Sequence, residues 1–226
     1  MLWRRSELRH LLSLTLTVSS RGYCTCTTSG ESSNSEISLS NESTTVSVKN
    51  KASRIRLLLF DVDGVLTDGR IELHSDGSES KCFHIRDGAA IMWAHRAGLL
   101  TGILSARTSV ATTLRTKQLE MPIVFQGVKA KLSAYEQILA TYQLTDTEVA
   151  YMGDDLLDLA VLARVGLSAA PSDAAVDVRQ KVDWTSSARG GKGAARDLIE
   201  LVLKAQALWP PIVEPQTDPE SALSHG

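Results

Sequence analysis

Two aspartates, Asp61 and Asp63, directly follow an apolar run at residues 55–60 that is typical of a buried strand. A second acidic group follows another apolar run at residues 149–152, and it consists of Asp154, Asp155 and Asp158. In an open α/β sheet, ligands bind at the carboxyl ends of the strands, so both groups are expected at the same edge. Carboxylates packed this closely repel each other unless a cation, a proton or a charged substrate lies nearby.

The residue types at this edge indicate which ligand the acids hold. Two unit charges 4 Å apart repel by about 4 kcal/mol at an effective dielectric near 20, so an uncompensated cluster is too costly. Hard carboxylate oxygens without His or Cys partners suit Mg²⁺, which takes one or two carboxylates, waters and a phosphate oxygen. The alternative for the second acidic group is helix capping, but the acids at the first strand favour a metal site.

A cation and a hydroxyl are expected near the same edge. Lys131 begins an expected helix there, where its ammonium group would neutralise a phosphate oxygen, although a lone lysine is more often simply solvated. Ser105 ends an expected strand, and its hydroxyl, together with the N–H groups of the next helix start, would hold a phosphate. An ordinary helix cap at Ser105 is compatible with that role.

Apolar runs alternate with amphipathic ones in the middle of the chain, which predicts an α/β fold with a doubly wound, Rossmann-like parallel sheet. The expected strands are residues 55–60, 99–105, 123–125, 149–152 and 166–169, and the expected helices are residues 88–97, 110–119, 131–142, 156–164 and 193–207. Polar and apolar residues alternate in residues 70–74 and 81–85 around a turn-rich segment at 75–78. This alternation predicts a β-hairpin after the first strand.

The spacing of the candidate site residues leaves no room for a separate cap domain. Ser105 and Lys131 are 26 positions apart, and Lys131 and Asp154 are 23 positions apart. Each interval is filled by one helix and one strand. The site is therefore expected to be open to water unless another subunit covers it.

The composition excludes several classes of function. The chain has 226 residues, with 24 basic against 26 acidic residues and 5% aromatic residues, so it shows no sign of a nucleic-acid-binding surface. No apolar run approaches the roughly 20 residues of a membrane helix. Only Cys82 lies in the expected domain, which gives no basis for a disulfide framework or a thiolate metal site.

The two ends of the chain differ from the middle. Residues 1–53 are expected to be a disordered or targeting tail, since Ser and Thr fill 19 of the first 50 positions. Its basic, acid-poor start resembles a transit peptide, and less well a secretory signal, but an unstructured extension fits equally. We expect the domain at residues 54–208, a flexible tail at 209–226, and a cytoplasmic protein, or an organellar one if the tail is a transit peptide.

Four motifs in order resemble the haloacid dehalogenase superfamily of aspartate-dependent phosphohydrolases. They are DVDGVLTDG at residues 61–69, LSAR at 104–107, Lys131, and GDDLLD at 153–158. The segment FHIRDG at residues 83–88, with those at 165–174 and 189–200, narrows the resemblance to the capless 3-deoxy-D-manno-octulosonate (KDO) 8-phosphate phosphatases. The resemblance spans about residues 54–208. It implies a Mg²⁺-dependent phosphatase of an anionic sugar phosphate in KDO and lipopolysaccharide biosynthesis.

The resemblance also implies a role for each matching residue. Asp61 would attack phosphorus and become an aspartyl phosphate, and Asp63 would act as general acid and base. The Mg²⁺ ligands would be the side chains of Asp61 and Asp154 and the backbone carbonyl of Asp63. Asp155 and Asp158 would orient Asp154 or Lys131. Lys131, also catalytic, and Ser105 would hold the phosphoryl oxygens.

The implied substrate contacts lie mostly after the hairpin. Besides Asp63, Ser105 and Lys131 they are His84, Ile85, Arg86, Asp87, Gly88, Arg107 and Arg115. In this family the hairpins assemble a homotetramer whose neighbouring subunits close each site, which agrees with the missing cap.

Some positions depart from the family pattern and some alternatives stay open. Met92 stands where some relatives have a basic residue, and Ala106 replaces a glycine. Residues 189–193 either reach an active site through the tetramer or form an ordinary glycine-rich helix start. A nonulosonate 9-phosphate phosphatase would use the same chemistry. A non-catalytic oligomerisation module, as found in some cytidylyltransferases, is disfavoured by the intact pair Asp61 and Asp63.

Overall fold

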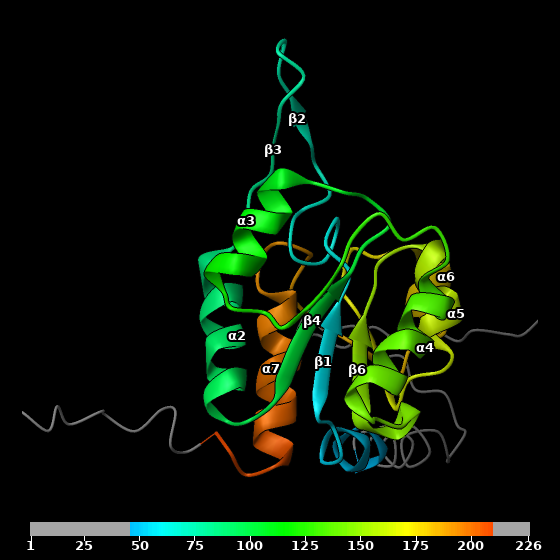
Figure 1. The fold of residues 1–226 in the computed structure, drawn as a ribbon. Coiled ribbons are helices and arrows are strands. Elements are labelled where there is room, and N and C mark those ends of the chain that lie inside the picture. The colour runs from blue at the N-terminus through cyan, green and yellow to red at the C-terminus, as the bar shows by residue number, and fades with distance from the viewer. Residues whose placement is uncertain (1–45, 210–226) are drawn as a thin grey trace, which may run out of the picture. The chain divides into compact units, whose positions relative to one another are not determined.

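Six strands form one parallel sheet in the computed structural model, which describes residues 46–209. The strands are β1 (Leu57–Phe60), β4 (Leu100–Leu104), β5 (Ile123–Phe125), β6 (Val149–Met152), β7 (Leu167–Ala170) and β8 (Trp184–Thr185). Their order is β5-β4-β1-β6-β7-β8, so the acid-bearing strands β1 and β6 are central neighbours (Figure 1). Both are buried along their whole length, as strands covered on two faces must be. The predicted doubly wound sheet is confirmed.

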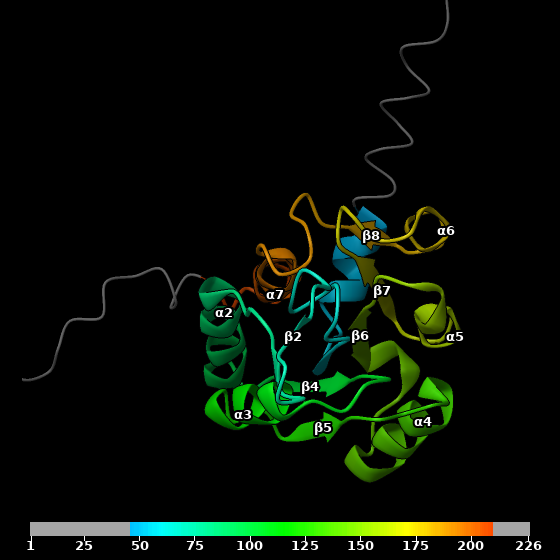
Figure 2. The ribbon, with the colours of Figure 1, turned by 90° about the horizontal axis from the view of Figure 1, so that it is seen from above.

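The helices cover both faces of the sheet (Figures 1 and 2). They are a helix at residues 46–52, α2 (Ile85–Arg96), α3 (Val110–Gln118), α4 (Lys131–Tyr142), α5 (Leu159–Leu162), α6 (Val176–Arg179) and α7 (Ala194–Ala205), with 3-10 turns η1 (Asp146–Glu148) and η2 (Leu156–Asp158). Alternate residues of β1 enter opposite cores, because successive strand side chains point to opposite faces. Leu58 and Phe60 pack with α2 and α7, whereas Leu57 and Leu59 pack with α4 and α5.

The predicted hairpin is present, but its second strand differs from the prediction. Strands β2 (Glu72–Leu73) and β3 (Glu79–Ser80) pair antiparallel and project beyond the carboxyl ends of the sheet (Figure 1). The strand expected at residues 81–85 is absent, because Lys81 turns its side chain into the protein and Ile85 already begins α2. Apart from this hairpin, the described residues contain no insertion between β1 and α2.

Several predicted boundaries need correction. Residues 46–52, placed in the expected tail, form a helix whose Val48 and Ala52 are buried in the core, so the folded part reaches back to residue 46. The helix expected at residues 156–164 is instead the turn η2 followed by the short α5. Helix α2 begins three residues before the expected Gly88, and α6 and β8 were not predicted. The expectations for residues 1–45 and 210–226 lie outside the described residues.

None of the helices in the described range 46–209 is both long enough and apolar enough to cross a membrane.

Candidate active site

The first acidic motif forms a tight loop at the end of β1. The N–H of Asp61 donates to the carbonyl of Met152 at 2.9 Å, which continues the β1–β6 pairing into the site. The carbonyl of Val62 accepts hydrogen bonds from three N–H groups, those of residues 65, 66 and 67, so the chain turns sharply. Gly64 has a φ of +92°, and a Cβ there would lie 2.0 Å from Oδ2 of Asp154. Only glycine therefore allows the second acidic motif to approach this loop.

Residues 189–193 pack against the back of the same loop. A Cβ on Gly190 would lie 1.7 Å from the carbonyl oxygen of Gly64, so the two backbones are in direct contact. The N–H of Gly191 donates to the carbonyl of Val65 at 2.9 Å, and the N–H of Gly190 donates to Oδ1 of Asp173 at 2.9 Å. This double-glycine contact supports the Asp61 loop from within its own subunit.

A buried network holds the ammonium group of Lys131 beside Asp61. Lys131 opens α4, and its Nζ lies 3.0 Å from Oδ1 of Asp61 and 2.6 Å from Oδ1 of Asp158. The hydroxyl of Tyr151, which was not predicted as a site residue, donates to the same Asp158 oxygen at 2.5 Å. Burial lowers the pKa of Lys131, but the carboxylates of Asp61 and Asp158 outweigh this effect and raise it overall. The ammonium group is therefore kept charged in place.

Asp158 itself is saturated with donors. Its Oδ1 contacts Lys131 and Tyr151, and its Oδ2 accepts the N–H groups of Asp154 and Asp155 at 3.0 and 3.2 Å. The side chain of Asp155 caps the turn η2 through the N–H of Leu156. Asp158 thus links the Lys131 ammonium group to the backbone that carries Asp154.

Asp61 and Asp154 have the geometry and chemistry of a divalent-cation site. Asp61, Asp154 and Asp158 each place one carboxylate oxygen within 4.8 Å of the others. Because Asp158 is saturated, the two available ligands are Asp61 and Asp154, and Oδ1 of Asp154 is buried without a partner. Burial, together with nearby carboxylates, raises the pKa of Asp61 to about 6 and that of Asp154 to about 8. This oxygen-only site suits Mg²⁺, and the contribution of the Asp63 carbonyl stays a prediction.

Asp63 lies between Lys81, which follows the hairpin, and Arg107, which follows β4. Its Oδ1 lies 2.6 Å from Nζ of Lys81, whose side chain is 1% exposed. Nε of Arg107 lies 3.6 Å from Oδ2 of Asp63, and the Arg107 guanidinium also pairs with Glu79 of β3 at 3.0 Å. Neither Lys81 nor Glu79 was predicted as a site residue.

One cavity brings the principal candidates together. It has a volume of about 200 Å³ and is lined by Asp61, Asp63, Ser105, Arg107, Lys131 and Asp154, together with Ala106, Asp155, Leu157 and Asp158. Ser105 is buried at the end of β4, and its Oγ accepts the N–H of Arg107 at 3.4 Å. A carboxylate nucleophile, a second acid, a fixed cation and a hydroxyl thus surround a space that can hold a phosphate group.

The predicted substrate contacts at residues 84–88 and Arg115 do not line this cavity. His84, Asp87, Gly88 and Arg115 line a separate, much smaller cavity between α2 and α3. The buried Asp87 carboxylate accepts the N–H of Arg196 at 2.9 Å through Oδ1 and so caps the start of α7, and its contact with a substrate stays a prediction.

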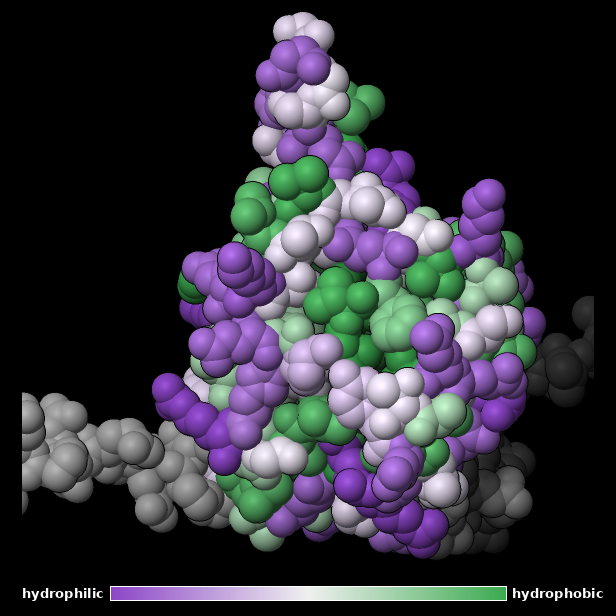
Figure 3. Space-filling model, viewed as in Figure 1, coloured by the Kyte–Doolittle hydropathy of each residue, from purple (hydrophilic) through white to green (hydrophobic). Residues whose placement is uncertain are grey.

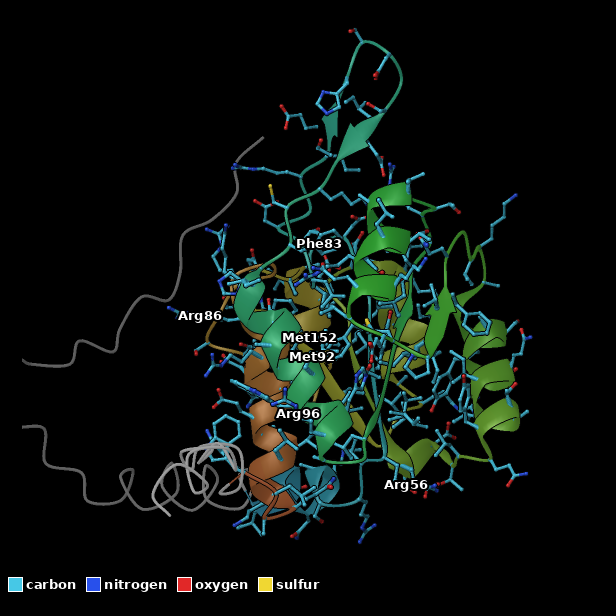
Figure 4. All side chains as sticks on the ribbon, turned by 60° about the vertical axis from the view of Figure 1, so that its left-hand side comes forward. Arg56, Phe83, Arg86, Met92, Arg96 and Met152 are labelled. Carbon is cyan, nitrogen blue, oxygen red and sulfur yellow. The ribbon has the colours of Figure 1, made fainter. Side chains whose placement is uncertain are left out.

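The remaining α2 residues point in different directions. Ile85 and Arg86 are exposed. Met92 is partly buried against the core (Figure 4). The substrate contacts of Ile85 and Arg86 stay predictions.

The chain is similar to known hydrolases. The pattern of the haloacid dehalogenase-like hydrolases matches residues 94–196. The chain is 40% identical to KDO 8-phosphate phosphatase of Yersinia pestis, covering 69% of this chain and 83% of the relative. It is 38% identical to the Salmonella typhi enzyme, covering 70% and 85%.

Solved structures show the same likeness. A putative subfamily III A hydrolase of Legionella pneumophila has a TM-score of 0.74 at 37% identity, covering 75% of this chain and 93% of its own. KDO 8-phosphate phosphatase of Moraxella catarrhalis, solved with magnesium, phosphate and KDO, has a TM-score of 0.72 at 32% identity, covering 74% and 95%.

The parallel sheet, the acidic motifs at its edge and the absence of a cap in the described residues define a capless hydrolase of the haloacid dehalogenase superfamily. Within that class, the chain belongs to the KDO 8-phosphate phosphatase family.

The glycine contact behind the Asp61 loop can be tested with Gly190→Ala. The added methyl group collides with the Gly64 carbonyl, so the loop must shift. We expect kcat to fall at least tenfold, with a loss of about 1–3 kcal/mol in the free energy of unfolding, as overpacking usually costs. Gly98→Ala is the control, because its φ of +82° costs stability while its Cβ meets no atom. Equal kcat in the Gly190→Ala variant and the wild type would contradict the role of this contact.

Metal binding should depend on pH, because the cation competes with protons on Asp61 and Asp154. The pKa values of about 6 and about 8 predict that Mg²⁺ affinity rises between pH 6 and pH 8, by up to about tenfold per unit for each proton released. Without metal, these raised pKa values mean that the folded state binds more protons than the unfolded state, so stability should fall as pH rises from about 4 to about 8. Calorimetric titration of Mg²⁺ at pH 6, 7 and 8 measures the first effect, and a constant affinity would contradict it.

Proposed function

We propose that this protein hydrolyses KDO 8-phosphate to KDO and inorganic phosphate through an aspartyl-phosphate intermediate. The observation that carries the proposal is Asp61 at the end of β1, 3.0 Å from the buried ammonium group of Lys131 and two residues before a second aspartate. The relatives that share 38–40% identity over most of their length are KDO 8-phosphate phosphatases, which supports this substrate.

The reaction begins with attack of an Asp61 oxygen on phosphorus. A bond forms between this oxygen and phosphorus while the bond from phosphorus to the sugar oxygen breaks, and Asp63 gives a proton to the departing sugar oxygen. Lys131 neutralises charge on the phosphoryl oxygens, and the Ser105 hydroxyl donates to one of them. Asp63 then takes a proton from water, which attacks phosphorus, releases phosphate and restores the Asp61 carboxylate.

The site also fits a Mg²⁺ ion, which the side chains of Asp61 and Asp154 and the backbone carbonyl of Asp63 would hold. When bound, the ion neutralises the negative charge that the phosphate group brings to this acidic edge. The buried, unpartnered oxygen of Asp154 and its raised pKa support this assignment.

The open site favours assembly into a homotetramer. Four large apolar side chains at and below the hairpin are 63–75% exposed, namely Leu73, Ile85, Val110 and Leu114. Figure 3 shows hydrophobic side chains gathered on α3 at the base of the hairpin. Contiguous exposed apolar surface is typical of interaction sites. A neighbouring subunit placed there would complete the substrate site. The cytoplasm stays the predicted compartment.

Substrate choice is tested by measuring rates on a panel of sugar phosphates with and without Mg²⁺. We expect kcat/KM for KDO 8-phosphate to exceed that for glucose 6-phosphate by at least 100-fold, because the Arg107 guanidinium in the cavity lining favours a sugar carboxylate. Removal of Mg²⁺ should abolish turnover. A preference for a nonulosonate 9-phosphate would move the assignment to that substrate, and comparable rates on all phosphates would contradict both.

Assembly is tested by light scattering after gel filtration. The wild type should have the mass of a tetramer, and Leu73→Asp together with Val110→Asp should produce smaller species, because each substitution places a charge in the proposed interface. Glu72→Gln, which changes an exposed hairpin residue on the other face of β2, should leave the mass unchanged. A monomeric wild type with full activity would contradict the proposed assembly.

A further inference from the structure

Lys81 is buried to an unusual degree for a lysine. Its side chain is 1% exposed although it directly follows the projecting hairpin. Lysines are almost never fully buried unless they are paired, because removing a charge from water is costly. The pairing partner here is Asp63, whose Oδ1 lies 2.6 Å from Nζ of Lys81. The ammonium group is therefore enclosed together with the proposed acid/base.

The two oxygens of Asp63 have different surroundings. Oδ1 accepts the short hydrogen bond from Lys81, whereas Oδ2 is buried without a hydrogen-bond partner. Nε of Arg107 lies 3.6 Å from Oδ2, beyond hydrogen-bonding distance, and Arg107 is half exposed and held by Glu79. One carboxylate oxygen is thus fixed by Lys81, and the other faces Arg107 without a hydrogen bond.

The geometry points to Lys81 as a positioning residue for Asp63, and this inference rests on the proposed phosphatase function. Lys81 holds Oδ1 and so fixes the orientation of the carboxylate that gives a proton to the sugar oxygen and later removes one from water. Because Lys81 and Glu79 lie on the outgoing arm of the hairpin, the position of this arm sets the orientation of Asp63. The hairpin thereby contributes to the chemical steps as well as to assembly.

This role predicts a specific kinetic effect. A side chain that is 1% exposed does not reach a substrate in the cavity, so its loss should leave KM nearly unchanged. Both steps that need Asp63 should slow down, since general acid/base catalysis contributes about 10²–10⁴-fold when the group is well placed. We expect kcat to fall by about 10–100-fold in Lys81→Met, with KM within about twofold of the wild type.

The test is a double-mutant cycle with Asp63→Asn, measured with KDO 8-phosphate and Mg²⁺. If Lys81 acts through Asp63, Lys81→Met should reduce kcat in the wild type but have little further effect in the Asp63→Asn background. Lys81→Arg should restore part of the lost kcat, and Lys129→Met, which removes an exposed lysine, should match the wild type. If Lys81→Met does not fold, Lys81→Gln serves in the same cycle.

Three results would overturn the inference. The first is a rise in KM at constant kcat in Lys81→Met. The second is a full additional loss of kcat when Lys81→Met is added to Asp63→Asn. The third is wild-type kcat in both Lys81→Met and Lys81→Gln. The substrate assignment is separated by repeating the measurements with p-nitrophenyl phosphate. Turnover of this compound without turnover of KDO 8-phosphate would reject the proposed substrate, and the mutant cycle could still be measured. No turnover of either compound would reject the proposed phosphatase function and, with it, the role of Lys81.

Discussion

The crowding of carboxylates at the ends of β1 and β6 is the constraint on which the rest of the site depends. The acids are compensated to different degrees, and Asp61 and Asp158 share Lys131. Asp61 faces Lys131, Asp63 faces Lys81 and Arg107, and Asp158 receives donors on both oxygens. Asp154 keeps a buried oxygen without a partner, and its pKa is raised to about 8. Lys131 is the one cation paired with this cluster of Asp61, Asp154 and Asp158, so negative charge is left uncompensated where a divalent cation fits.

The backbone contributes to this arrangement as much as the side chains do. Parallel pairing of Leu57 with Val149 through Phe60 with Met152 brings the ends of β1 and β6 to the same level. Gly64 then allows Asp154 to approach, and Gly190 packs against the Gly64 carbonyl from behind. Main-chain contacts of this kind are rigid, because close-packed backbone has no rotamer to adjust. They place the Asp61 carboxylate without relying on a separate cap.

Most of the sheet and the core of the site could be predicted from local sequence patterns. The apolar runs before Asp61 and Asp154 are visible in the sequence, and parallel topology places their ends at one edge. The contacts of Lys81, Tyr151 and Gly190 join segments far apart in the chain, so no local pattern shows them. The sequence offered one signal for Lys81. In an extended segment it would share a face with the apolar residues Phe83 and Ile85, which indicates that its side chain points inward. The helix at residues 46–52 is a short segment next to a Ser/Thr-rich region. Its sequence alone does not predict it, because it is stabilised by the packing of Val48 and Ala52 against the core.

The central claim is that Asp61 carries the phosphoryl group during turnover. Rapid quenching of the Asp63→Asn variant with KDO 8-phosphate and Mg²⁺, followed by mass spectrometry of its peptides, tests this claim most directly. The account predicts a phosphorylated peptide containing Asp61, which decays more slowly than in the wild type and is absent from Asp61→Asn. Phosphate release without any phosphorylated peptide, or a phosphoryl group on a different residue, would contradict the account.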